Sequence, residues 1–152
     1  MSQLQLFGQV LIASLLGGVI GLEREFQRKK AGLRTFSLVS SGSCFFTVIA
    51  AYLSEKSSLM SPIQIDPTRV IQAVAIGIGF IGSGLIVSYK LQVEGLTTAA
   101  ALWLDAAIGI GVGLGLYWLS LLATGLAVLM LSVIKLLEKK IAHKEEAVED
   151  NG

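Results

Sequence analysis

Residues 66–115 read DPTRVIQAVAIGIGFIGSGLIVSYKLQVEGLTTAAALWLDAAIGIGVGLG, and this stretch decides the class of fold. Two apolar runs of membrane-spanning length flank a short polar joint at residues 89–98. Both runs are rich in glycine, and one acid, Asp105, stands near the middle of the second run. A carboxylate at that depth costs roughly 2.5–3.5 kcal/mol on insertion scales. We therefore expect Asp105 to have either a partner or a function.

The chain as a whole is strongly apolar. Of its 152 residues, 53% are hydrophobic, and the mean hydropathy is +0.73. A soluble domain of this length rarely contains so many apolar residues, because polar residues must cover its surface. The pattern predicts an all-α membrane protein with one domain of five transmembrane helices over residues 1–138 and a charged cytoplasmic tail at residues 139–152. The expected spans are residues 4–22, 36–53, 68–88, 97–115 and 116–137. The first run lacks the basic region of a signal peptide, so we expect it to be retained.

The basic residues predict how these helices are oriented. If the loop at residues 23–35 is cytoplasmic, ten of the 12 Lys and Arg residues lie on that side. Only Lys56 and Arg69 then lie outside. The positive-inside rule predicts an N-terminus outside the cell and a C-terminus in the cytoplasm.

Several classes of site are disfavoured. One cysteine, Cys44, and one histidine, His143, exclude an intramolecular disulfide and argue against structural zinc. A net charge of +1 carries no signal for nucleic acid. The sequence contains no visible nucleophile–base pair or phosphate cradle, so we expect neither an enzyme nor a cofactor. A formal G-x-G-x-x-G at residues 77–82 lies inside an apolar run and indicates helix packing instead of nucleotide binding. Helix packing is expected at Gly77, Gly79, Gly82, Gly84 and Gly109.

One helical face carries the main candidate site. Thr98, Ala101 and Asp105 are spaced to share that face, with Gly109 one turn further along. The face either lines a polar cavity, where Asp105 binds a cation or relays a proton, or buries Asp105 against a hydroxyl or basic residue that fixes helix packing. Thr97 and Thr98 either cap the fourth helix or add to that cavity.

Polar residues also mark the two membrane faces. Glu23, Arg24, Arg34 and Thr35 can form a polar constellation, in which Glu23 pairs with a basic residue and which contacts a partner protein or a pore mouth. Alternatively, this loop only sets the topology, and its basic residues touch anionic lipid.

At the opposite face, Asp66 is expected to cap the third helix, with Pro67 in the first turn. A cation entrance formed by Asp66 and Arg69 is the alternative.

Four motifs together resemble the MgtC/SapB family of bacterial inner-membrane proteins: GLEREFQRKKAGLRT at residues 21–35, DPTR at 66–69, GIGFIGSGLI at 77–86 and GLTTAAALW at 95–103. The resemblance implies a multi-pass inner-membrane protein linked to magnesium homeostasis, survival under stress and virulence. Longer family members append a soluble domain, and this sequence is expected to be the short form. Asp105 stands where the resemblance leads us to expect a small or hydroxyl residue.

The resemblance favours an accessory or regulatory protein that acts through helix contacts inside the membrane. The expected partners are membrane lipids, a second copy of the chain in a homodimer, and another inner-membrane protein complex. The alternative is a small transporter or channel for Mg²⁺ or H⁺. Its ion path would be formed by Asp105, Thr98, Thr97 and Glu23, with no metal-ligand set specified.

Overall fold

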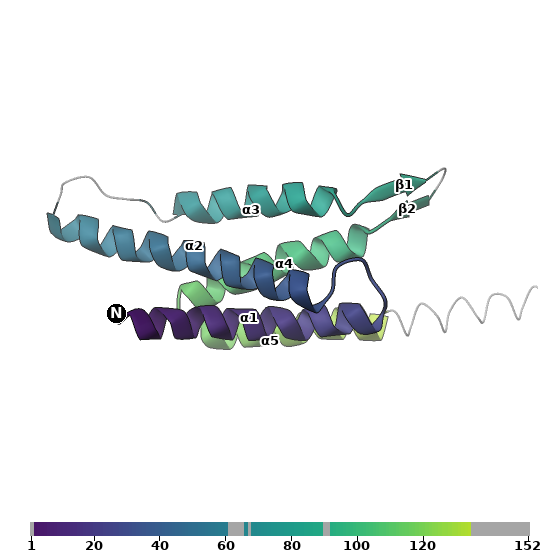
Figure 1. Ribbon diagram of the computed structural model, residues 1–152, viewed down its shortest axis with the longest axis horizontal. Helices are drawn as coiled ribbons and strands as arrows, with labels where there is room; N and C mark the ends of the chain where they lie inside the picture. The colour runs from purple at the N-terminus through teal and green to yellow at the C-terminus, as the bar shows by residue number, and fades with distance from the viewer. Residues whose placement is uncertain (1, 61–65, 67, 90–91, 135–152) are drawn as a thin grey trace, which may run out of the picture.

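The computed structural model describes residues 2–60, 66, 68–89 and 92–134 (Figure 1). This part of the chain is mainly helical, as predicted. Its helices run back and forth along one axis (Figure 1). In chain order the elements are α1 (Gln3–Phe26), α2 (Leu33–Met60), α3 (Thr68–Ser83), strands β1 (Val87–Tyr89) and β2 (Gln92–Glu94), α4 (Leu96–Gly113), α5 (Tyr117–Leu129) and a π-helix (Met130–Ile134).

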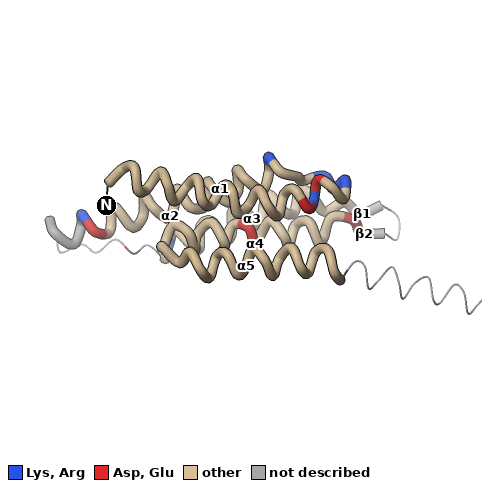
Figure 2. The backbone as a smooth tube through the Cα atoms, turned by 90° about the horizontal axis from the view of Figure 1, so that it is seen from below, with Lys and Arg blue, Asp and Glu red and all other residues tan. Residues whose placement is uncertain are grey.

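Within the described residues, 3 helices are long and apolar enough to cross a bilayer, namely Gln3–Phe26, Leu33–Lys56 and Leu96–Gly113. The segments Thr68–Ser83 and Tyr117–Val133 are apolar but shorter. Figure 2 shows the described Lys and Arg residues near the ends of the bundle, with mostly uncharged helices between them. The membrane-protein class follows from these lengths, whereas five crossings and their orientation stay predictions.

The first two helices extend further than the apolar runs alone indicated. α1 begins with a capping box between Ser2 and Gln5 and continues through its charged end to Phe26. α2 begins at Leu33, whose backbone N–H donates to the Glu25 carboxylate at 2.9 Å. A side chain of the preceding helix therefore satisfies one of the exposed amides at the start of α2.

The third helix is shorter than predicted, because it ends at Ser83 rather than at residue 88. The N–H of Gly84 donates to carbonyls in the last turn of α3, which tightens the end of the helix. The chain then forms an antiparallel hairpin in which β1 pairs with β2 and Val87 faces Glu94. Val87 and Ser88, which were expected in the span, thus belong to strand β1.

The hairpin returns to α4 through Gly95, which has a φ of +92°. A Cβ there would collide with the carbonyl group of Leu85, so both the angle and the space require glycine. Gly95 is also the N-cap residue of α4, which has no side-chain cap. The prediction that Thr97 or Thr98 caps this helix is therefore wrong, because a left-handed glycine occupies the capping position.

The centre of the bundle is formed where α1, α2 and α4 pack against one another. Glycines of α1 and α4 face α2 so closely that a Cβ at Gly21 or Gly113 would meet α2 atoms at less than 3.0 Å. α5 packs on α4 and α1, whereas α3 packs mainly on α4 and only slightly on α2. Three helices thus form a tight core, and α3 lies at its edge.

Candidate functional site: a buried carboxylate among three helices

Asp105 lies at the point where the three central helices meet. Its side chain on α4 is 0% exposed. A Cβ built at Gly17 of α1 would lie 2.7 Å from Oδ1 of Asp105 and 2.6 Å from Cβ of Ser40 on α2. The absence of a side chain at Gly17 therefore makes the space that the carboxylate and Ser40 share.

The polar atoms at this point are not satisfied by the protein. Neither oxygen of Asp105 has a hydrogen-bond partner in the described part of the chain, and neither does Oγ of the buried Ser40. An unsatisfied buried polar group costs about 1–3 kcal/mol, and more when it is charged. A bound proton, cation or water molecule at Asp105 would each relieve this cost.

A second buried polar side chain, Gln9, lies nearer to the start of α1. Its Nε2 donates to the carbonyl oxygen of Val112 at 3.3 Å, and its Oε1 has no partner among the described residues. Gln9 borders a cavity of about 40 Å³ that Tyr52 and Glu55 also line. That volume is enough for about one water molecule.

An apolar layer separates Gln9 from Asp105. On α1, Ala13 stands one turn after Gln9 and one turn before Gly17, and it is fully buried. The layer is the buried cluster of Ala13, Cys44, Val48 and Val112. The four side chains of this cluster carry no oxygen, so they do not themselves connect the two polar points.

The other residues predicted on the Asp105 face divide into two groups. Thr98 and Ala101 are buried on α4 with Asp105, whereas Thr97 is exposed. Glu23 lies at the end of α1, in a separate polar cluster. The structure therefore brings Thr98 and Asp105 onto one buried face and leaves Thr97 and Glu23 outside it.

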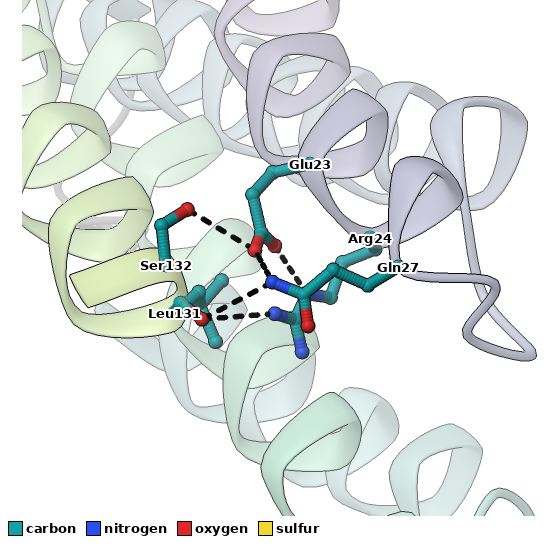
Figure 3. A network of polar contacts seen from close by, with 5 residues as sticks. All are labelled: Glu23, Arg24, Gln27, Leu131 and Ser132. Carbon is teal, nitrogen blue, oxygen red and sulfur yellow. Dashed lines mark hydrogen bonds and ion pairs between the residues drawn. The ribbon is translucent and has the colours of Figure 1, made fainter. Parts of the chain in front are cut away.

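That polar cluster joins the end of α1 to the π-helix (Figure 3). Arg24 is 2% exposed; its Nε pairs with Glu23 Oε2 at 2.5 Å, and its Nη2 donates to the Leu131 carbonyl at 3.4 Å. Gln27 donates to the same carbonyl and to Glu23 Oε1. Ser132 also donates to Glu23 Oε1, at 3.2 Å. As predicted, Glu23 pairs with a basic residue, and the pair fixes α1 to the end of the last helix.

The remaining residues predicted at the membrane faces lie apart from this cluster. Arg34 is exposed and Thr35 is half-buried, both in the first turns of α2. At the other end of the bundle, Asp66 Oδ1 accepts hydrogen bonds from the backbone N–H and hydroxyl of Thr68, at 2.9 and 2.7 Å. These hydrogen bonds, and less strongly the charge of Arg69, lower the pKa of the Asp66 carboxyl below its usual range. Asp66 therefore caps α3 as predicted.

The glycines predicted to pack helices differ widely in their surroundings. A Cβ at Gly109 would lie less than 3.0 Å from the Ser40 carbonyl oxygen, so α4 and α2 touch there. Gly82 makes an ordinary contact with α4, and Gly84 touches only its own turn. A Cβ would meet nothing within 4 Å at the other two positions, Gly77 and Gly79.

The sequence of this protein is similar to a described family. The model of the MgtC family matches residues 10–140. The chain belongs to the MgtC family. The YhiD protein of Escherichia coli (strain K12) is 35% identical over 136 residues, which cover 90% of this chain and 63% of YhiD. The SrpB protein of Synechococcus elongatus is 40% identical over 139 residues, covering 86% of this chain and 75% of SrpB.

The MgtC protein of Brucella abortus is 46% identical over 104 residues, which cover 68% of this chain and 40% of that protein. This MgtC-family chain thus spans less than two thirds of the length of the E. coli and Brucella relatives. No solved structure matches it.

Sequence reasoning on this MgtC-family chain found Asp105 but missed the residues around it. Gln9, Ser40 and Gly17 were not among the candidates for the buried polar site. A usable signal was the recurrence of Gln9, Ala13, Gly17 and Gly21 at every fourth position, which places small and polar residues on one face of α1. That pattern shows a close helix contact but does not say which helix provides the partner.

Asp105→Ala is expected to stabilise the protein by about 1–3 kcal/mol, because it removes a buried carboxyl group without hydrogen bonds. Thermal unfolding in detergent can be followed by a thiol-reactive dye, since Cys44 is the only cysteine and is buried. Asp66→Ala removes a helix cap and should therefore lower the stability of the protein. A loss of stability in Asp105→Ala would instead mean that the native protein holds a cation or donor at this carboxylate.

Proposed function

We propose that this chain is a multi-pass protein of a bacterial inner membrane, with all five helices crossing the bilayer. The N-terminus lies outside and the C-terminus in the cytoplasm. The alternating direction of consecutive helices supports this arrangement (Figure 1). The concentration of basic residues in the loop after α1 supports the orientation.

Its proposed role is that of an accessory or regulatory protein in magnesium homeostasis and stress survival, including survival in a host. The E. coli relative YhiD carries a name that assigns it provisionally to magnesium transport. The resemblance of the sequence motifs to the MgtC/SapB family supports regulation of other membrane proteins. The chain acts by contacts between its own helices and those of another inner-membrane complex.

The observation that favours regulation over transport is the apolar layer between Gln9 and Asp105. A hydrated Mg²⁺ ion or a proton moving along the centre of the bundle would have to cross the cluster of Ala13, Cys44, Val48 and Val112. The side chains of these four residues carry no oxygen that could replace the hydration shell of an ion. A contact surface on the outside of the bundle needs no path of this kind.

Reconstitution in liposomes tests the choice between these roles. The purified chain is expected to give no Mg²⁺ or H⁺ flux above that of protein-free liposomes loaded with a magnesium- or pH-sensitive dye. In cells at low magnesium, crosslinking should join it to a second membrane protein that co-purifies with it. Flux that depends on the protein, without a crosslinked partner, would contradict the regulatory role.

Transport through Asp105 is the second candidate, because both oxygens of this carboxylate lack partners in the described structure. It predicts dye-detected flux that Asp105→Asn abolishes while the amount of protein in the membrane stays the same. Equal activity of the wild type and Asp105→Asn at matched levels would remove Asp105 from the mechanism.

A homodimer is also part of the proposal. Gly79 is exposed on α3 with nothing within 4 Å of an added Cβ, which allows a helix of a second copy to approach closely.

A further inference from the structure

A long apolar groove runs between α2 and α3, the two neighbouring helices that pack least well. Its volume is about 730 Å³, within the range of small-molecule sites. Arg69 lies in the first turn of α3 and lines the groove together with apolar and small residues. Representative lining residues are Leu38, Gly42 and Phe46 on α2, and Ala73, Gly77 and Ile81 on α3.

The groove is not closed by contact between its two walls. A Cβ added at Gly42 or at Gly77 would meet nothing within 4 Å, although these glycines stand on facing helices. Phe46 and Phe80, which also line the groove, remain exposed. An apolar surface left without neighbours loses its dispersion contacts, so in a bilayer hydrocarbon is the natural filling.

The length of the groove suits a lipid acyl chain. Along α3, the residues from Arg69 to Ile81 rise about 18 Å at 1.5 Å per residue. One leaflet of a bilayer's hydrocarbon core is about 15 Å thick. An acyl chain that starts at Arg69 and follows α3 therefore matches the length of the groove.

The charge at one end of the groove favours an anionic head group. Arg69 is exposed and forms no ion pair within 4 Å in the part of the chain that the structure covers. The nearby Asp66 carboxylate caps α3 through Oδ1 and attracts the charge of Arg69, but it forms no ion pair with Arg69 within 4 Å. A guanidinium group is always charged and binds phosphate oxygens in a bidentate manner.

The position of Arg69 fits the level of lipid head groups. In Figure 1 the first turn of α3 lies at the same end of the bundle as the turn between α4 and α5. Tyr117 and Trp118 are exposed at that turn. Exposed tyrosine and tryptophan are typical of the membrane–water interface. Arg69 therefore stands where the phosphate of a lipid would be.

We infer that the groove between α2 and α3 binds a phospholipid, with one acyl chain along Gly42 and Gly77 and the phosphate at Arg69. This site is distinct from the Asp105 site and does not depend on the proposed regulatory role. The lipid would fill the space that keeps α3 apart from α2.

Native mass spectrometry of the full chain, titrated with phosphatidylglycerol in detergent, tests the inference. The wild type is expected to bind the first lipid molecule with higher affinity than any further lipid molecules. Arg69→Gln should weaken this binding about tenfold or more, because it removes a charged hydrogen-bond donor. Gly77→Leu should abolish it, because the new side chain enters the groove. Gly125→Leu is the matched control, since a Cβ at Gly125 on α5 also meets nothing within 4 Å.

Four results would overturn the inference. Equal binding by Arg69→Gln, or by neutral diacylglycerol in place of phosphatidylglycerol, would remove the phosphate contact. Equal loss in Gly125→Leu and Gly77→Leu would make the effect general rather than local. A wild-type dimer or bound polypeptide that disappears in Gly77→Leu, with no lipid bound, would assign the groove to a helix. Unfolding temperatures that agree among the leucine variants would establish that the comparison is between folded proteins.

Discussion

Gly109→Val is expected to separate α4 from α2 and to lower the free energy of unfolding by at least about 3 kcal/mol. A Cβ at this position would lie less than 3.0 Å from the Ser40 carbonyl oxygen and 3.0 Å from its Cα. These are backbone atoms, so no side-chain rotation can relieve the clash, and the two helices must move apart. Overpacking of an ordinary core site costs about 1–3 kcal/mol, and a rigid backbone neighbour places this site at or above the upper end.

The measurement is thermal unfolding in detergent, followed by the reaction of Cys44 with a thiol dye. Cys44 belongs to the α2 surface beside α4, so separation of the two helices exposes it directly. Gly125→Val is the matched control, because it introduces the same β-branched side chain into a helix where a Cβ meets nothing within 4 Å. Similar unfolding temperatures for the two variants would show that α4 and α2 do not touch at Gly109.

The helical content, the buried Asp105 face and the Glu23 ion pair could all be predicted from sequence. Each depends on a local signal: long apolar runs, residues spaced by one helical turn, and a carboxylate beside arginine. The apolar run of α3 continues past its end at Ser83, so hydropathy alone could not separate helix from hairpin there. Local pattern thus determines which residues are buried more reliably than where an element stops.

The roles of individual glycines could not be predicted, because a glycine contact depends on the partner helix. Gly77 and Gly109 both lie in glycine-rich runs of similar composition. In the structure, Gly109 touches the backbone of Ser40, while Gly77 borders an open groove. The π-helix at Met130–Ile134 could not be predicted either, because its sequence MLSVI continues an apolar run without interruption. In the structure, side chains of α1 form hydrogen bonds to Leu131 and Ser132 of this π-helix.

Arg24→Ala is expected to destabilise the bundle by about 3 kcal/mol and to loosen the π-helix after α5 from α1. Removing one member of a buried ion pair leaves the other charge uncompensated, at a cost of about 3–5 kcal/mol. Glu23 would keep its hydrogen bonds from Gln27 and Ser132, which places the cost near the lower limit. The Leu131 carbonyl would lose one of its two side-chain donors. Thermal unfolding with the Cys44 thiol readout measures the loss.

Two companion variants separate the pair from general charge effects. Lys29→Ala removes one positive charge from the same loop, but Lys29 is exposed, so its effect should be small. Arg24→Lys keeps the charge yet should recover only part of the stability, because an ammonium group lacks the planar fork that serves Glu23 and Leu131 together. If Arg24→Ala and Lys29→Ala behaved alike, the polar cluster would not hold the π-helix to α1. Full recovery by Arg24→Lys would mean that charge alone, without the hydrogen bond to the π-helix, provides the attachment.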